Sequence, residues 1–323
     1  MDLPEDTLRY VFGFLTKPTM YATLCLVCKH WARALPRVQF APLLMCIKKT
    51  KALFVDARGF VVDEVVVHPG VSPRLGHSTI AVAPDGCHLY ACEGVTLTRY
   101  RVTSGFLRKN KVVLCDHRLN RTVRVIYGRH MELWLLLNHG SCPELLNVDL
   151  RKSKIMNRFA LAANPEQNHC IRAYDGCYVP REDCLVVLVQ STTTYIVKVP
   201  LLKDRFQQAA ATYSWTPLHF ALPGPPGLVW EGRLRAGTLT LLGTEELCYA
   251  VPAAGVVHAS RLKDTLGIME PWDCPGLLGL CALHGQMYGL TAEGLKIVRN
   301  RGGKRTLGTR MDCAGGTHLL AVG

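Results

Sequence analysis

The feature that most constrains this 323-residue chain is a recurrence of short β-rich runs after Pro42. Each run is rich in β-branched and aromatic residues and is bounded by Gly, Asp, Asn or Pro, which is the pattern of strands separated by turns. The runs come in threes, and five sets follow one another: 79–84, 88–94 and 95–102; 122–128, 131–138 and 145–150; 170–176, 183–190 and 194–200; 227–232, 238–244 and 246–252; 276–285, 286–294 and 295–300. This pattern predicts an all-β domain and excludes a helical solenoid.

The spacing between the sets is nearly regular. Their middle runs contain Tyr90, Trp134, Val186, Leu241 and Tyr288, which lie 44, 52, 55 and 47 residues apart. Repeats of roughly 40 to 50 residues made of short strands resemble the blades of a β-propeller. A pair of β-sandwiches is the alternative that spacing alone leaves open. We therefore expect a mainly β fold with a β-propeller, with six blades preferred and five or seven allowed.

The two ends of the β-rich region resemble parts of one further set. Runs at 43–47, 52–55 and 60–67 form an incomplete set, and the last run, 315–322, has the small polar lead and short apolar run of 76–82. A C-terminal strand that joined the first blade would close the ring and remove its open edges. The sequence thus predicts a propeller-like domain over 41–323, closed by the C-terminal strand.

The first 40 residues have a different periodicity. Apolar residues with the i, i+3, i+4 and i+7 spacing of an amphipathic helix are Leu8, Val11, Phe12 and Leu15. A second helical stretch begins near Met20 and stops at Pro36, and a break near Cys25 would divide it into two helices. We expect a small helical domain over 1–40.

Three motifs occur in order within this segment. The chain opens on Leu3-Pro4, continues to Phe14-Leu15, and later reads VCKHW over 27–31. This order resembles the F-box, whose hallmarks are a Leu-Pro opening, an apolar pair before a Phe-Leu ending, and a later Val-Cys-Lys-x-Trp. Thr7 departs from the family's usual apolar residue, and Thr19 from a frequent acid. The resemblance covers about the first 35 residues.

The resemblance implies a three-helix F-box that binds the Skp-type adaptor of a cullin-RING ubiquitin ligase, while the C-terminal domain selects the substrate. A physical argument agrees, because 35 residues alone cannot bury a stable core and need another surface. The residues expected to form this partner-binding stripe are Leu3, Pro4, Leu8, Val11, Phe12, Leu15, Leu24, Val27, Cys28 and Trp31. The alternative is that the helices cap the chain's own β domain and these residues are ordinary core.

No pattern in the chain predicts catalysis, a metal site or a cofactor. Cys25 and Cys28 have a C-x-x-C spacing, but no second pair follows at zinc-ribbon distance. The stretch 76–80 lacks the last glycine of a nucleophile elbow, and 302–306 lacks the upstream glycine of a phosphate loop. We expect a non-catalytic chain; the enzyme alternative is a propeller hydrolase with a helical cap.

The chain carries 38 basic and 25 acidic residues, a net charge of +13. The first 36 residues contribute only +1, and the basic residues of the β domain cluster at 48–51, 109–111, 151–154 and 299–305. This charge suggests a protein target with an acidic or phosphorylated surface. A basic propeller that binds nucleic acid or anionic lipid is the alternative; we expect neither nucleic acid nor a membrane as the partner.

The first residues lack the pattern of a secretory signal, and the longest stretch without charged residues, 206–230, contains four prolines. We therefore expect a cytoplasmic or nuclear protein with free thiols. Together these observations predict a substrate-recognition subunit of an SCF-type ubiquitin ligase, in which the F-box binds the adaptor and the propeller binds an unidentified target protein.

Overall fold

A computed structural model describes the following residues: 3–12, 14, 17–34, 43–56, 58–67, 79–83, 86–103, 105–128, 132–140, 142–161, 172–190, 194–201, 214–217, 229–230, 233–234, 237–242, 246–261, 270–283, 285–301, 304–311, 313–314 and 316–322. Three short helices come first: α1 (Glu5–Phe12), α2 (Pro18–Leu24) and α3 (Lys29–Ala34). The break expected near Cys25 separates α2 from α3. Across these ranges, every helix is too short or too polar to span a membrane.

The described strands form one eight-stranded sheet, four four-stranded sheets and one two-stranded sheet. Each four-stranded sheet is antiparallel and joins strands that are consecutive in the chain. Their strands are β8 (Thr122–Tyr127), β9 (Glu132–His139), β10 (Cys142–Asp149) and β11 (Lys154–Ala160); β12 (Arg172–Val179), β13 (Cys184–Gln190), β14 (Thr194–Pro200) and β15 (Ser214–Pro217); β18 (Thr238–Leu242), β19 (Glu246–Val251), β20 (Val256–Arg261) and β21 (Glu270–Asp273); β22 (Leu277–Leu283), β23 (Gln286–Thr291), β24 (Gly294–Arg301) and β25 (Lys304–Met311).

The eight-stranded sheet contains two such antiparallel units. Its strands are β1 (Leu43–Lys48), β2 (Lys51–Val55), β3 (Val61–Val67) and β26 (Gly316–Val322) in one unit, and β4 (Thr79–Val82), β5 (His88–Glu93), β6 (Thr96–Thr103) and β7 (Phe106–Cys115) in the other. A short parallel pairing of Val66 and Val67 with Phe106 and Leu107 joins β3 to β7. The C-terminal β26 pairs with β1, so the first and last strands of the β region lie side by side.

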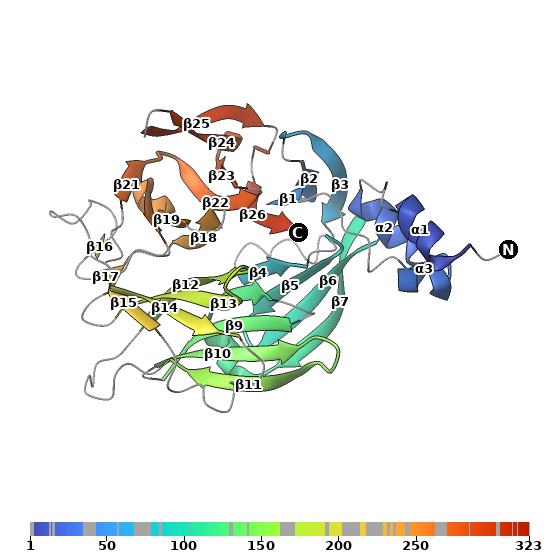
Figure 1. The fold of residues 1–323 in the computed structure, drawn as a ribbon, viewed down its shortest axis with the longest axis horizontal. Helices are drawn as coiled ribbons and strands as arrows, with labels where there is room; N and C mark the ends of the chain where they lie inside the picture. The colour runs from blue at the N-terminus through green and yellow to red at the C-terminus, as the bar shows by residue number, and fades with distance from the viewer. Residues whose placement is uncertain are drawn as a thin grey trace.

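The antiparallel units are arranged as a ring (Figure 1). One edge strand of each unit contacts the corresponding strand of the next, in the order β4, β8, β12, β18, β22 and β26, and β26 in turn contacts β4. These are the inner strands of the ring. The fourth strands of the units therefore lie at its outside.

Apolar clusters fill the space between neighbouring sheets. One cluster joins Tyr90 and Leu97, in β5 and β6, to Leu133 and Leu135 in β9 of the next unit. The central strands β9 and β13 are nearly continuous runs of buried residues, because each of their sheets is covered on both faces. A two-layer sandwich would leave one face of each sheet exposed.

Most predicted runs coincide with strands, including the outer strand β3, but several other outer strands were not predicted. The strands β7, β11 and β25 have no counterpart in the sets of three, because β7 and β11 contain few buried residues and β25 is rich in basic residues. Of the run predicted over 227–232, only 229–230 lie in the described residues, where Val229–Trp230 (β16) pairs with Arg233–Leu234 (β17) in a hairpin separate from the other sheets. The inner strand of that unit is β18, since 238–242 pairs with β19 and contacts β12 and β22.

Candidate functional site: the N-terminal helices

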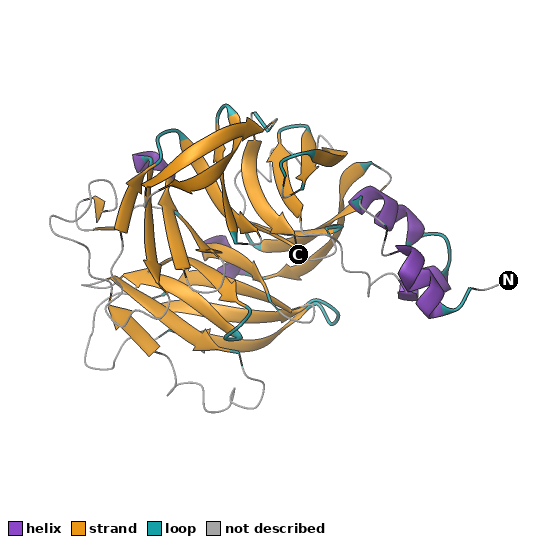
Figure 2. Ribbon diagram, turned by 45° about the horizontal axis from the view of Figure 1, so that its top comes forward, coloured by secondary structure: helices purple, strands orange, loops and turns teal. Residues whose placement is uncertain are grey.

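The three helices form a small unit at one side of the ring (Figure 1 and Figure 2). Helix α1 packs on α3, and the rings of Phe12 and Trp31 meet edge to face with centroids 5.2 Å apart. The Nε2 atom of His30 lies 3.1 Å from the carbonyl oxygen of Leu3. These contacts bring the Leu-Pro opening next to the Val-Cys-Lys-x-Trp motif, two segments that are far apart in the sequence.

Helix α2 attaches this unit to the sheets. The carboxylate of Asp63 in β3 accepts hydrogen bonds from the backbone N–H of Thr19 at 2.9 Å and from its hydroxyl at 2.7 Å. The thiol of Cys87 donates to the carbonyl oxygen of Pro18 at 3.2 Å. An acid at the first turn of a helix satisfies amides that have no partner within the helix and lies near the positive end of its dipole. Thr19, a departure from the F-box pattern, therefore anchors the helices to the ring.

The predicted partner-binding stripe divides into an inner and an outer part. The side chains of Leu8 and Phe12 are only 1% and 3% exposed, and they belong to an apolar cluster that continues into β1 to β7. Leu24 and Trp31 are half-buried against the same cluster. In this structure the chain's own core therefore covers Leu8 and Phe12, and their contact with a partner stays a prediction.

The outer part of the stripe is exposed to solvent. Leu3, Pro4, Val11, Val27 and Cys28 are all exposed. Leu15, the remaining residue of the stripe, lies outside the described residues. The capped-core alternative thus fits the burial of Leu8 and Phe12, and it does not account for the exposed residues of the stripe.

Four further large apolar side chains, which the sequence reasoning did not select, are exposed on the same unit. The side chains of Tyr10 and Phe14 are 73% and 70% exposed, and their rings contact each other at 5.3 Å. We call the whole set the exposed helical surface: Leu3, Pro4, Tyr10, Val11, Phe14, Met20, Leu26, Val27 and Cys28. Seven of the fifteen exposed large hydrophobic side chains in the described ranges lie on this surface, although the helices are a small part of the chain.

A sequence signal for the second apolar face was present. Tyr10 and Phe14 are four residues apart, the spacing that places two side chains on one face of a helix. That face differs from the one that carries Leu8 and Phe12, so a search for a single stripe excludes it.

The two cysteines of the C-x-x-C spacing lie in and beside the turn that links α2 to α3. Cys25 is partly buried and Cys28 is exposed, and neither forms a disulfide. Throughout the described ranges, no cluster of three or more His, Cys, Asp or Glu side chains is arranged to hold a metal ion.

A buried acid lies on the inner strands of the ring. Asp175 in β12 accepts a hydrogen bond of 2.6 Å from the backbone N–H of Leu239 in β18, and pairs with Arg124 in β8 at 3.4 Å. Burial raises the pKa of this carboxyl, and the Arg124 guanidinium opposes that shift. Because these contacts join three consecutive inner strands, Asp175 has a structural role in the ring.

Comparison with known proteins bears on the fold. No family model and no curated protein matches this chain. A chain in a crystal structure of the nidogen/laminin complex matches with a TM-score of 0.55 and 9% sequence identity, covering 87% of this chain and 98% of that chain. TolB from Acinetobacter baumannii matches with a TM-score of 0.50 and 14% identity, covering 87% and 66% of the two chains. Both are β-propeller-like, and at these identities the likeness concerns the fold alone. The predicted mainly β, β-propeller-like fold is confirmed.

Proposed function

We propose that this chain is the substrate-recognition subunit of an SCF-type ubiquitin ligase. The N-terminal helices form an F-box that binds a Skp-type adaptor, and a ring of six blades binds a target protein. The observation that carries this proposal is the exposed helical surface, which gathers large apolar side chains on helices that bear the F-box motifs.

Covering this surface would release free energy. A large apolar side chain contributes roughly 1.5 to 3 kcal/mol when it is fully buried, before the costs of ordering two partners. Several such side chains, half or more exposed in the free chain, therefore suffice for a stable complex. Their helical placement suits recognition by a groove on a partner protein.

The anchor at Asp63 gives the helices a defined place on the ring. Two hydrogen bonds to Thr19 and the shared apolar cluster fix α2 to β3 and β6. In the proposed mechanism the chain performs no chemistry itself. It holds the target near a ubiquitin-loaded enzyme carried by other subunits, so that a reaction between separate molecules takes place within one assembly.

Substitution of Val11 by Asp tests this proposal. Val11 is 50% exposed, so a charge there should leave the fold intact and weaken binding to a purified Skp-type adaptor about tenfold or more, since a carboxylate would be removed from water at the interface. Binding of the full chain is measured by co-purification and titration calorimetry, and folding by thermal unfolding.

The matched control is Val95→Asp, which changes a 43% exposed valine in the β5–β6 turn and should leave adaptor binding unchanged. Substitutions of Leu8 or Phe12 are unsuitable tests, because they disrupt the core. Failure of the wild-type chain to bind the adaptor at micromolar concentration would refute the F-box assignment.

A further inference from the structure

The positive charge of the chain is concentrated in one segment. Residues 99–158 contain 13 of the 38 basic residues but only four of the 25 acidic ones, a net charge of +9 out of +13. This segment forms the outer strands β6 and β7 of one unit and β8 to β11 of the next.

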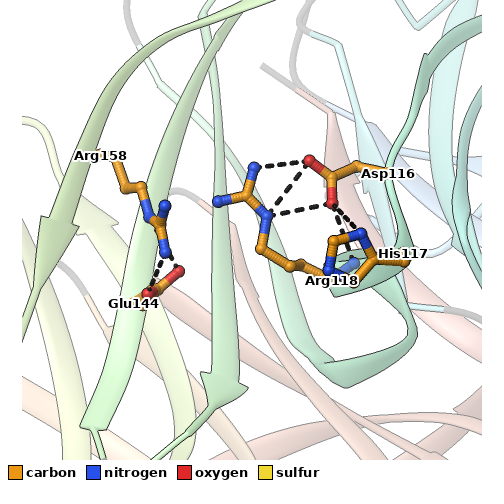
Figure 3. Close-up of polar contacts among 5 residues, drawn as sticks. All are labelled: Asp116, His117, Arg118, Glu144 and Arg158. Atoms are coloured by element: carbon orange, nitrogen blue, oxygen red, sulfur yellow. Dashed lines mark hydrogen bonds and ion pairs between the residues drawn. The ribbon is translucent and has the colours of Figure 1, made fainter.

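Three of its four acids are already engaged elsewhere. Asp116 accepts hydrogen bonds from the Nε and Nη2 atoms of Arg118, which hold the pKa of that carboxyl well below its ordinary value, and Arg158 binds Glu144 at 2.6 Å (Figure 3). Asp149 accepts hydrogen bonds from two backbone amides in the turn that follows it. These carboxylates therefore do not neutralise the basic residues of β6 and β7.

The register of β6 and β7 places like charges directly opposite each other. Arg101 pairs with Arg108, and Arg99 pairs with Lys111, while Asn110 is the extra residue of a bulge. Because Arg99 and Arg101 are two residues apart on one strand, all four cations lie on the same face of the hairpin. Like charges opposite one another destabilise a sheet. We call Arg99, Arg101, Arg108 and Lys111 the cationic face.

Two members of the cationic face contact only neutral groups. The Nε and Nη2 atoms of Arg99 donate to the amide oxygen of Asn110 at 2.8 and 2.5 Å. The Nζ atom of Lys111 donates to the hydroxyl of Ser153 at 2.9 Å, which brings the β10–β11 turn to the border of the face.

The other two members also lack a carboxylate partner in the part of the chain that the structure describes. The guanidinium of Arg108 lies 4.8 Å from the centre of the Phe106 ring, a cation–π contact. The Nε atom of Arg101 is buried and has no hydrogen-bond acceptor there. Arg101 as a whole is only partly buried, and a cation without a counter-charge is costly there, so this face is suited to an anion that approaches from outside.

We propose that the cationic face binds a phosphorylated segment of the target protein. This inference rests on the proposed function, in that it names the feature by which the ring selects its target. Arginine binds phosphate with two parallel hydrogen bonds, and three of the four cations are arginines.

The size of the face favours this ligand over nucleic acid. Cross-strand neighbours lie about 5 Å apart and next-but-one residues on a strand about 7 Å apart, so the four cations span one or two phosphates. A nucleic acid that gains affinity from backbone contacts needs a longer row of phosphate partners.

Basic residues on an outer strand also discourage edge-to-edge association between sheets. Beyond its pairing with β3 at Phe106 and Leu107, β7 has no further strand at its outer edge in the described ranges. That explanation predicts self-association when the charge is removed. Unlike our proposal, it predicts no dependence on phosphate.

The test compares Arg108→Gln with Arg58→Gln in the full chain. Both arginines are exposed and both substitutions remove one charge, but Arg58 lies in the β2–β3 turn, away from the face. Fluorescence anisotropy measures binding of a labelled phosphoserine and phosphothreonine peptide library and of its unphosphorylated counterpart. We expect the phosphorylated library to bind wild type about tenfold more tightly, with that gain lost in R108Q and kept in R58Q.

Thermal unfolding supplies a second readout. R108Q should unfold at a higher temperature than wild type, because it removes the repulsion with Arg101. Inorganic phosphate should stabilise wild type more than R108Q at matched ionic strength.

Three outcomes would overturn the inference: equal binding of both libraries, equal losses in R108Q and R58Q, or tighter binding of an oligonucleotide or of phosphatidylserine vesicles. Adaptor capture is measured on the same preparations. If capture is intact while phosphopeptide binding fails, only this inference falls; if capture itself fails, the proposed function falls.

Discussion

His258 in β20 shows how burial sets the properties of a single side chain. It is fully buried between β19 and β21, and neither ring nitrogen has a hydrogen-bond partner in the described part of the chain. Burial lowers its pKa to about 4. The folded chain therefore holds this imidazole neutral at pH values where an unfolded chain would protonate it.

The consequence is a loss of stability in mild acid. Between about pH 6.5 and pH 4 the unfolded state binds more protons than the folded state, so the free energy of unfolding falls as the pH falls through this range. We expect His258→Asn to remove about 1 to 3 kcal/mol of this pH dependence, as measured by urea unfolding at several pH values. The control is His117→Asn, whose side chain is 85% exposed. Parallel pH profiles for wild type and His258→Asn would contradict the assignment.

At the scale of elements, the contact between α2 and β3 was beyond sequence reasoning. The helical periodicity predicted the helices and the break near Cys25, because it depends on residues a few positions apart. The carboxylate that accepts hydrogen bonds at the start of α2 belongs instead to Asp63 in β3, which is 44 residues from Thr19 in the chain. The outer strands β7 and β11 were missed for a related reason: most of their residues are exposed or only partly buried, and their basic residues interrupt the apolar pattern.

Removal of the Asp63 carboxylate should loosen the helices without unfolding the ring. In Asp63→Ala the amide and hydroxyl of Thr19 lose their acceptor, which costs about 1 to 2 kcal/mol locally. Hydrogen exchange of the backbone amides of α2 should accelerate, while the amides of β9 and β13 should remain protected. The neighbouring Glu64→Ala, which breaks a half-exposed pair with Lys51, is the control and should leave that exchange unchanged. Unchanged exchange in Asp63→Ala would show that the apolar cluster alone holds α2.

At the scale of the whole molecule, the pairing of β26 with β1 joins the two ends of the β region. Gly316 at the start of β26 approaches β1 so closely that a Cβ atom there would lie 2.6 Å from the sulfur of Cys46 and 3.2 Å from the carbonyl oxygen of Cys313. Both cysteines are fully buried, so neither has free space into which to move. A side chain at position 316 would therefore strain the junction that closes the ring.

We expect Gly316→Ala to destabilise the chain by about 1 to 3 kcal/mol through overpacking. Gly279→Ala in β22 is the matched control, because a Cβ atom there meets nothing within 4 Å, and it should be neutral or slightly stabilising. Denaturant unfolding followed by circular dichroism measures both. Equal stability of the two variants would mean that the ends of the ring separate without affecting the rest.

The sequence by itself determined the alternation of short strands, their grouping into repeated sets and the helical segment before them, because each is visible in the spacing of nearby residues. Only the tertiary structure decided which face of the helices is covered: Leu8 and Phe12 face the core, whereas Tyr10 and Phe14 remain exposed. It also decided that Arg101 lies opposite Arg108, since that pairing depends on strand register and a bulge. Periodicity reports that a face is apolar or charged, while the neighbours that cover it are set by contacts between residues distant in the chain.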